Sequence, residues 1–208
     1  LFVFVFMIGA CLSQGRAQTK SAVSYKNPVV DIAMPDPTVI KAADGYFYVY
    51  ATESTRNVPI MKSKDLVEWT YCNTAFTNKT RPRFEPKAGI WAPDINYING
   101  KYVLYYAMSV WGGEQTCGIG VATANSPQGP FTDHGKMFRS NEIGVQNSID
   151  PSLLQYEGRN YLVWGSFRGI YVIELTADGL SIMSGAKKKR IAGTAFEAVY
   201  IHKHGDYY

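Results

Sequence analysis

The chain has 208 residues, of which 46% are hydrophobic, 14% aromatic and 18% charged, which suits one folded domain and excludes a disordered chain. The formal charge is +4, but Arg16 and the run 187–190 supply five of the cations, and the remainder balances at 16 − 17 = −1. Because a nucleic-acid-binding domain should carry a broad basic face, we expect no nucleic-acid partner.

The N-terminal residues 1–10 form an apolar run about as long as the core of a signal peptide and too short to span a bilayer. Small residues follow where a signal peptidase would cut, so residues 1–17 are predicted to be a signal peptide and residues 18–208 the exported domain. Residues 8–11 also resemble a lipoprotein box, which would make Cys11 a lipid anchor instead. Both interpretations predict an exported protein, secreted or periplasmic, without a membrane span. The charged leader that should precede the run is absent, so we expect an N-terminal truncation.

Four segments further along the chain share one pattern. In each, a carboxylate opens a short β-rich stretch, a turn built on Xaa-Gly follows, and an aromatic-rich strand comes next. The segments are 36–50, 91–106, 149–164 and 196–208. Their opening acids lie 58, 56 and 47 residues apart and are Asp36, Asp94, Asp150 and Glu197. Further strand-like stretches at 118–124 and 169–175 lie between the segments, and no long amphipathic helix is indicated.

Two hairpins per repeat make a four-stranded sheet, and repeated sheets of about fifty residues predict an all-β fold, the β-propeller. Radial packing places the first strand of each blade at the central axis, so the opening acids should converge there. The fourth segment stops at Tyr208, inside its second strand. The sequence therefore predicts a partial propeller of about three and a half blades, truncated at its C-terminus.

The two cysteines outside the leader, Cys72 and Cys117, have no metal-binding spacing. A disulfide between them is compatible with an exported protein, but two separate buried thiols are the expected arrangement. His202 and His204 alternate on one predicted strand, which is more typical of a polar strand face than of a metal site.

Three of the opening acids, Asp36, Asp150 and Glu197, carry the functional hypothesis. An acid before proline is often only a turn residue whose side chain bonds nearby backbone. Three acids at the blade period, converging on one channel, are harder to explain in that way, because clustered carboxylates raise one another's pKa. Two carboxylates across a cleft are what glycoside hydrolysis needs, and the many aromatic residues suit stacking on sugar rings.

The strings at 34–37, 91–94, 148–151 and 196–198 resemble those of glycoside hydrolase family 43, in family order, from about residue 28 to the end. The resemblance implies a five-bladed propeller and an inverting mechanism. Asp36 would be the general base that activates water, and Glu197 the general acid that protonates the leaving oxygen. Asp150 would tune the pKa of Glu197 and orient it, while Asp94 would be structural.

Within the family, the chain is most similar to the arabinan-degrading members. That similarity rests on Asn147, on the segment 165–170 and on the pair at 111–112. It implies that Trp91 and Trp111 are sugar platforms. The other residues implied to bind substrate are Gly112, Asn147, Ser148, Ile149, Ser166 and Phe167.

The resemblance predicts an exported enzyme that cleaves α-1,5-linked L-arabinan internally, with an arabinose-containing plant polysaccharide as its partner. We expect no cofactor for the reaction, no metal among the site residues, a structural calcium at most, and a monomer at full length. The first alternative is an exo-acting α-L-arabinofuranosidase or β-xylosidase of the same family. The second is a non-catalytic carbohydrate-binding propeller, which the acid trio disfavours.

Overall fold

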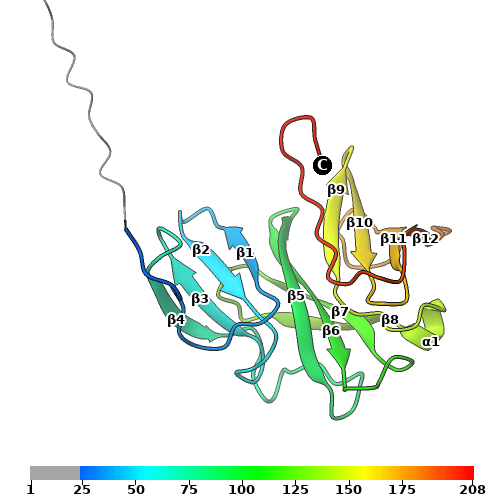
Figure 1. The fold of residues 1–208 in the computed structure, drawn as a ribbon, viewed down its shortest axis with the longest axis horizontal. Coiled ribbons are helices and arrows are strands. Elements are labelled where there is room, and N and C mark those ends of the chain that lie inside the picture. The colour runs from blue at the N-terminus through cyan, green and yellow to red at the C-terminus, as the bar shows by residue number, and fades with distance from the viewer. Residues whose placement is uncertain (1–23) are drawn as a thin grey trace, which may run out of the picture.

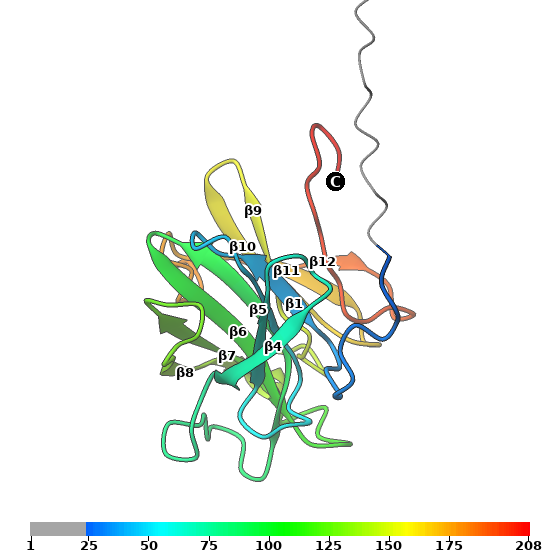
Figure 2. The same ribbon diagram turned by 90° about the vertical axis from the view of Figure 1, so that its left-hand side faces the viewer.

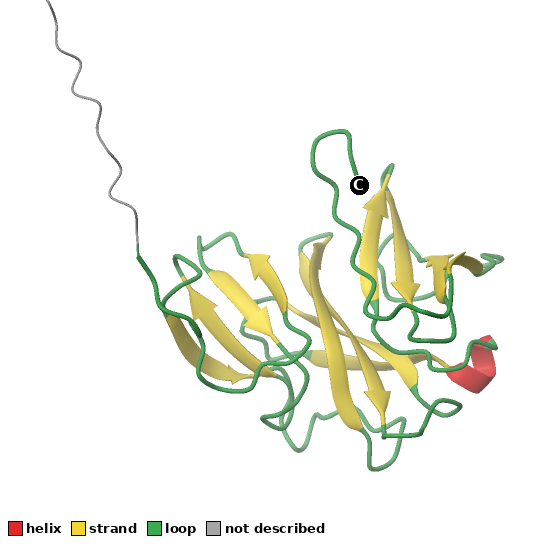
Figure 3. Cartoon of the chain, viewed as in Figure 1, coloured by secondary structure: helices red, strands yellow, loops and turns green. Residues whose placement is uncertain are grey.

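The computed structural model describes residues 24–208, which consist almost wholly of strands and turns (Figure 3). These residues form three four-stranded antiparallel sheets, each ordered as along the chain. The first sheet comprises β1 (Thr38–Lys41), β2 (Phe47–Tyr50), β3 (Pro59–Ser63) and β4 (Trp69–Thr74). The second comprises β5 (Gly89–Ile98), β6 (Lys101–Ser109), β7 (Gly118–Ala124) and β8 (Thr132–Arg139). The third comprises β9 (Ser152–Tyr156), β10 (Arg159–Trp164), β11 (Ile170–Glu174) and β12 (Lys189–Ala192).

The three sheets are successive blades that fan out around a common side. β1 lies against β5 and β5 against β9, so the first strands of neighbouring blades contact one another. Figure 1 shows the blades side by side in chain order, and Figure 2 shows the first blade in front of the other two. The predicted all-β propeller is therefore confirmed, with three complete blades in the described residues. The predicted leader, residues 1–17, lies outside them.

The central blade is buried on both faces because it lies between the other two. Along β6, Leu104, Tyr106 and Met108 pack against the first blade, whereas Val103 and Tyr105 pack against the third. Successive side chains of a strand point to opposite faces, so a strand between two cores must be apolar at every position. This explains the unbroken apolar run of β6, whose residues are almost all buried.

The fourth segment differs from its prediction, because it forms no extended hairpin. After β12 the described chain has no further strand, and the expected second hairpin is reduced to a tight turn closed by His204 and Tyr207. The segment runs beside β9 (Figure 1), and Tyr208 packs edge-on against Tyr156 with ring centroids 6.0 Å apart. A strand needs a neighbouring ladder, and the segment pairs with none. It still brings residue 197 to the axis.

Cys72 and Cys117, the two cysteines in residues 24–208, are unpaired, as expected, but differ in burial. Cys117 is fully buried in a small cluster with Ala107 and Ile149. Cys72 is only half-buried at the outer strand of the first blade, so the expectation of a buried thiol is wrong there. The short α1 (Ser140–Ile143) links the second and third blades.

Candidate active site

Two adjoining cavities lie where the first strands of the blades begin. The larger, of about 610 Å³, is lined by Asp36, Asp150 and Glu197 together. The smaller, of about 330 Å³, is lined by the opening residues of all three innermost strands and of the fourth segment, and shares Asp36 and Asp150 with the first cavity. Residues separated by 161 positions thus share one space, as the propeller hypothesis requires.

Asp36 stands immediately before β1 and is held by the end of β2. The Thr52 hydroxyl donates to Asp36 Oδ2 at 2.6 Å, and Thr52 Oγ1 accepts the Ala92 N–H at 2.7 Å. Thr52 thereby connects the first acid to the innermost strand of the second blade. The Asp36 carboxylate is thus held by a side chain 16 residues away, which is not the local bonding of a simple turn residue.

Asp150 stands before β9 and reaches across to the fourth segment. Its Oδ2 accepts the Ala198 N–H at 3.2 Å. Burial raises the pKa of Asp150 to about 6; the Ala198 hydrogen bond opposes this, and the nearby charges of Glu197 and Asp36 add to it. Asp150 therefore lies close enough to Glu197 and Asp36 to be affected by the charge of each.

Glu197 enters the cavity from the fourth segment and is tied to the third blade. Ser166, just beyond β10, donates to Glu197 Oε2 at 3.1 Å, and Ser166 O accepts from Asn147 Nδ2 at 3.0 Å. The backbone adds a further link, because the Phe167 N–H donates to Phe196 O at 2.9 Å. These three bonds hold the carboxylate at the mouth of the cavity although its segment forms no strand.

The backbone has the same unusual conformation at one position near the start of each innermost strand and at one position in the fourth segment. Asp36, Ala92, Asp150 and Ala198 have φ values of 49°, 40°, 57° and 51°, in the left-handed region. Non-glycine residues are uncommon there, and such strain is concentrated at functional sites. The repeated turn aims the adjoining side chains at the common cavities instead of along the sheets.

Aromatic side chains form one wall of the larger cavity. Trp111 is 93% exposed and packs against the half-buried Trp91, with ring centroids 5.4 Å apart and an interplanar angle of 51°. Phe167 lines the same cavity and is 48% exposed. An indole left in solvent beside three acids is not a core residue, so its exposure favours a role in ligand contact.

The remaining predicted contacts divide into two groups. Gly112, Asn147, Ile149 and Ser166 line the cavity beside the acids. Ser148 does not: its side chain is fully buried, its hydroxyl donates to Val145 O at 2.8 Å, and it accepts the Trp164 indole N–H at 3.1 Å. Instead of reaching the cavity, Ser148 supports the loop that carries its neighbours.

A charged bridge crosses the rim between the second and third blades. Arg168 lies within 2.9 Å of Glu114, and its Nε also donates to Glu114 Oε2 at 3.1 Å. Gln146 Nε2 donates to the same carboxylate at 2.6 Å. The Glu114 backbone O accepts the Asn147 N–H at 2.7 Å, so this bridge also fixes a cavity residue.

Asp94 behaves differently from the other three opening acids. It is 6% exposed, and its Oδ2 accepts from the Leu153 N–H and from Asn96 Nδ2, each at 2.7 Å, while Oδ1 accepts weakly from Thr38 Oγ1 at 3.5 Å. Burial raises the pKa of Asp94 to about 6 against these hydrogen bonds. Asp94 therefore ties together the innermost strands of all three blades, which agrees with the expected structural role.

Comparison with known proteins identifies relatives of this chain. Residues 25–208 match the family model described as Glycosyl hydrolases family 43. The chain belongs to this family. An extracellular endo-α-(1→5)-L-arabinanase of Bacillus subtilis is 34% identical over 186 residues, covering 83% of this chain and 57% of the relative. A probable arabinan endo-1,5-α-L-arabinosidase C of Aspergillus niger is 32% identical, covering 83% and 56%.

Solved structures of arabinanases have a fold similar to that of this chain. An arabinanase of Bacillus subtilis superposes with a TM-score of 0.65 at 32% identity, covering 75% of this chain and 56% of that one. An exo-1,5-α-L-arabinanase from a bovine ruminal metagenomic library superposes with a TM-score of 0.72 at 29% identity, covering 88% and 65%. The chain thus spans somewhat more than half the length of the relatives it matches, and these three blades fit their five-bladed propeller fold.

Sequence reasoning missed two residues of this family 43 site, Thr52 and Glu114. Thr52 could have been found by position, because a hydroxyl residue stands at or just beyond the end of the second strand in every blade: Thr52, Ser109 and Ser166. Glu114 had no such signal. Its role depends on Arg168, 54 residues away, and only the packing of the loops brings the two together.

Two further expectations concern metals and membranes. Within residues 24–208 there is no group of three or more His, Cys, Asp or Glu side chains arranged to hold a metal ion. His202 stacks on Tyr200 with ring centroids 6.4 Å apart. In the same part of the chain, the structure contains no helix with the length and apolar character needed to cross a bilayer.

Proposed function

We propose that the full-length protein is an inverting glycoside hydrolase that cleaves α-1,5-linked L-arabinan at internal bonds. The observation that carries the proposal is the set of three carboxylates, from three separate parts of the chain, around one cavity with an exposed indole at its wall. The relatives named as arabinanases support the choice of substrate.

In the proposed reaction, Asp36 accepts a proton from a water molecule as that water attacks the anomeric carbon. Glu197 donates its proton to the glycosidic oxygen as the bond to the anomeric carbon breaks. Asp150 is assigned the third role, to modulate and orient Glu197, and its Oδ2 accepts the N–H of the next residue, Ala198. Thr52 and Ser166 position the base and the acid through the hydrogen bonds described above.

Substrate binding is assigned to the aromatic wall and the polar rim. Trp91 and Trp111 offer faces on which the C–H surfaces of arabinose units stack, and Phe167 lies farther along the same cavity. Asn147 and Ser166 offer amide and hydroxyl groups for sugar hydroxyls. We expect no metal to be needed for the proton transfers, since the carboxylates perform both; a calcium ion would be structural.

Product analysis of the full-length protein on linear arabinan tests the proposal. A ladder of oligomers is expected, and the first product should have the anomeric configuration opposite to that of the substrate by NMR. Arabinose alone would indicate exo action, which the similarity to the exo-acting ruminal arabinanase makes the second candidate. Release of xylose from xylosides would assign the protein to the β-xylosidases, and binding without hydrolysis would make it a non-catalytic carbohydrate-binding propeller.

The same proposal includes an exported location, because degradation of a polysaccharide takes place outside the cytoplasm. One relative carries the word extracellular in its name. Whether the protein is secreted, periplasmic or anchored at Cys11 is tested by fractionation and by mass spectrometry of the mature N-terminus. A new N-terminus at Gln18 is expected, and a lipid-modified Cys11 would replace that assignment.

A further inference from the structure

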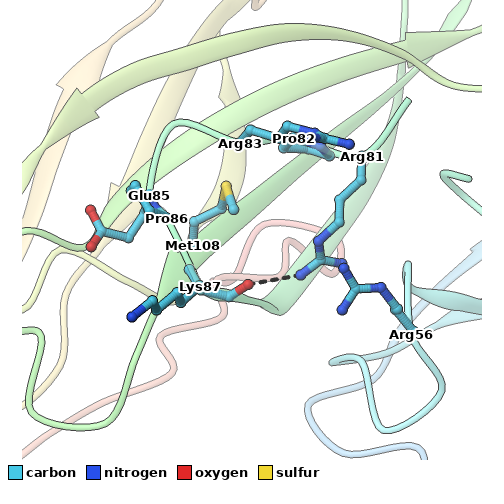
Figure 4. A pocket seen from close by; sticks show the side chains of 9 residues that line it. Arg56, Arg81, Pro82, Arg83, Glu85, Pro86, Lys87 and Met108 are labelled. Carbon is cyan, nitrogen blue, oxygen red and sulfur yellow. Dashed lines mark hydrogen bonds between the residues drawn. The ribbon is translucent and has the colours of Figure 1, made fainter. Parts of the chain in front are cut away.

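A cavity of about 390 Å³, distinct from the acid-lined one, lies between the first two blades (Figure 4). It is built from the β2–β3 loop, from the segment that leads into β5, and from Met108 near the end of β6. The same strand ends also build the candidate active site. Thr52 lies in the first of these loops, and Trp91 follows the second. The cavity therefore lies beside the same strand ends as the active site, although the two cavities share no lining residue.

The acids around this cavity already have partners. The buried Arg81 donates to both carboxylate oxygens of Glu53, and its Nη2 donates to Ala88 O at 2.8 Å (Figure 4, dashed line). Burial alone would raise the pKa of Glu53, but the hydrogen bonds from Arg81 and from backbone N–H groups lower it. Glu85 forms an ion pair with Arg139. These acids are therefore not available to neutralise further cations.

Three cations at the rim remain without an acidic partner. Arg56, Arg83 and Lys87 line the cavity, and none of them forms an ion pair with a carboxylate in residues 24–208. Asn78 holds two of them in place: its Oδ1 accepts from Arg56 Nε at 3.1 Å, and its backbone O accepts from Arg83 Nη2 at 3.0 Å. The rim is thus a fixed positive site that lacks its counter-charge.

Carbon surface accompanies the charged side chains in the lining of the cavity. Pro82, Pro86 and Met108 contribute carbon surface, with Met108 between the charged side chains in Figure 4. A sugar ring combines C–H faces with polar substituents, so it matches this mixed lining of carbon and charged groups better than a small inorganic ion does. A volume of about 390 Å³ lies within the range of about 300–1,000 Å³ that is typical of small-molecule sites.

We propose that this pocket binds a uronic acid residue of the polysaccharide whose neutral chain occupies the active site, an inference that rests on the proposed function. The carboxylate would lie against the guanidinium of Arg56 or Arg83, which pair with planar anions through two parallel hydrogen bonds. Lys87 would add a second positive charge. Such a site would hold arabinan chains that are attached to an acidic backbone.

Equilibrium binding by the full-length protein tests this assignment. The probes are an oligogalacturonide, its carboxyl-reduced counterpart and inorganic phosphate. The pocket variant combines Arg83→Gln with Lys87→Gln. Its matched control combines Lys187→Gln with Lys188→Gln, which removes the same charge from an exposed segment of the third blade. The pocket variant should bind the oligogalacturonide about tenfold more weakly or worse, because charge-assisted hydrogen bonds are lost, and the control should bind like the wild type.

Three results would overturn the assignment: equal affinity of the pocket variant and the wild type, equal affinity for the carboxyl-reduced oligomer, or tighter binding of phosphate than of the acidic oligomer. Hydrolysis of neutral linear arabinan is measured with the same proteins and should be unchanged in the pocket variant. Absence of that hydrolysis in the wild type would refute the proposed function alone. A wild type that hydrolyses arabinan but binds the acidic and the carboxyl-reduced oligomer equally well would refute this inference alone.

Discussion

The innermost strand of the second blade differs from those of the first and third at one decisive position. Ala92 has the same left-handed backbone as Asp36 and Asp150, and each of these three residues precedes a proline. In the first and third blades the residue at this position is an acid that faces the cavity. In the second blade it is an alanine, and the acid stands two residues later at Asp94.

This two-residue displacement changes what the carboxylate does. Asp36 and Asp150 line both cavities, whereas Asp94 is 6% exposed and accepts hydrogen bonds from the strands of both neighbouring blades. The register of β5 and β6 shifts between Trp91 and Asp94, which marks the place where the second blade departs from the pattern. The repeated backbone thus carries acids that face the cavities in two blades, and in the blade between them an acid that ties the innermost strands together.

The largest expected effect comes from neutralising the acids that face the cavity. Glu197→Gln and Asp36→Asn should each lower kcat on arabinan by roughly 10²–10⁴-fold, because each removes one proton-transfer group. Affinity for arabinan oligomers should stay within a few-fold, as measured by calorimetry. Asp94→Asn is the matched control and should retain most of the activity. If Asp94→Asn were as inactive as the other two variants, the difference in role between Asp94 and the cavity-facing acids would be contradicted.

For the free energy of unfolding, substitution of Asp94 should have a larger effect than substitution of Glu197 or Asp36. Asp94→Ala leaves the Leu153 N–H without an acceptor and should lower the free energy of unfolding by about 1–3 kcal/mol. Asp94→Asn keeps one acceptor oxygen and should cost less. Denaturant titration of the full-length protein measures both. Equal losses in the two variants would show that the charge of Asp94, not its hydrogen bond, holds the strands.

The pH dependence of stability should distinguish Asp94 and Asp150, whose pKa values are raised, from the acids whose pKa values are lowered. The pKa of Asp94 and that of Asp150 are each raised to about 6, so the folded protein holds these protons more tightly than the unfolded chain does. Their stabilisation is complete below the ordinary pKa of about 4 and is lost as the pH rises through 6. Each acid should contribute a slope of at most about 1.4 kcal/mol per pH unit between these limits.

Between pH about 4 and 6, the free energy of unfolding should fall less steeply with pH in Asp94→Asn and in Asp150→Asn than in the wild type. Acids with lowered pKa values, such as Asp178, act in the opposite direction, so the comparison is made between variant and wild type.

The repeat and the acids were predictable because they depend on local patterns: alternating strands, Xaa-Gly turns and an acid at each blade start. The convergence of Asp36, Asp150 and Glu197 followed from propeller geometry alone. The absence of strands after β12 was not predictable, because pairing depends on a neighbour and not on the segment's own residues. Ser148 shows the same limit, since only packing turns its hydroxyl away from the cavity.

The smallest expected effect probes the shared backbone itself. Ala92→Gly should stabilise the protein by about 1 kcal/mol, because glycine adopts φ near 40° without the steric penalty that alanine carries, although its greater unfolded-state entropy offsets part of the gain. Ala177→Gly, at an exposed position outside the left-handed set, is the control and should destabilise slightly. Activity should be retained in both. If Ala92→Gly destabilises the protein as much as the control does, then the left-handed backbone at Ala92 is not strained.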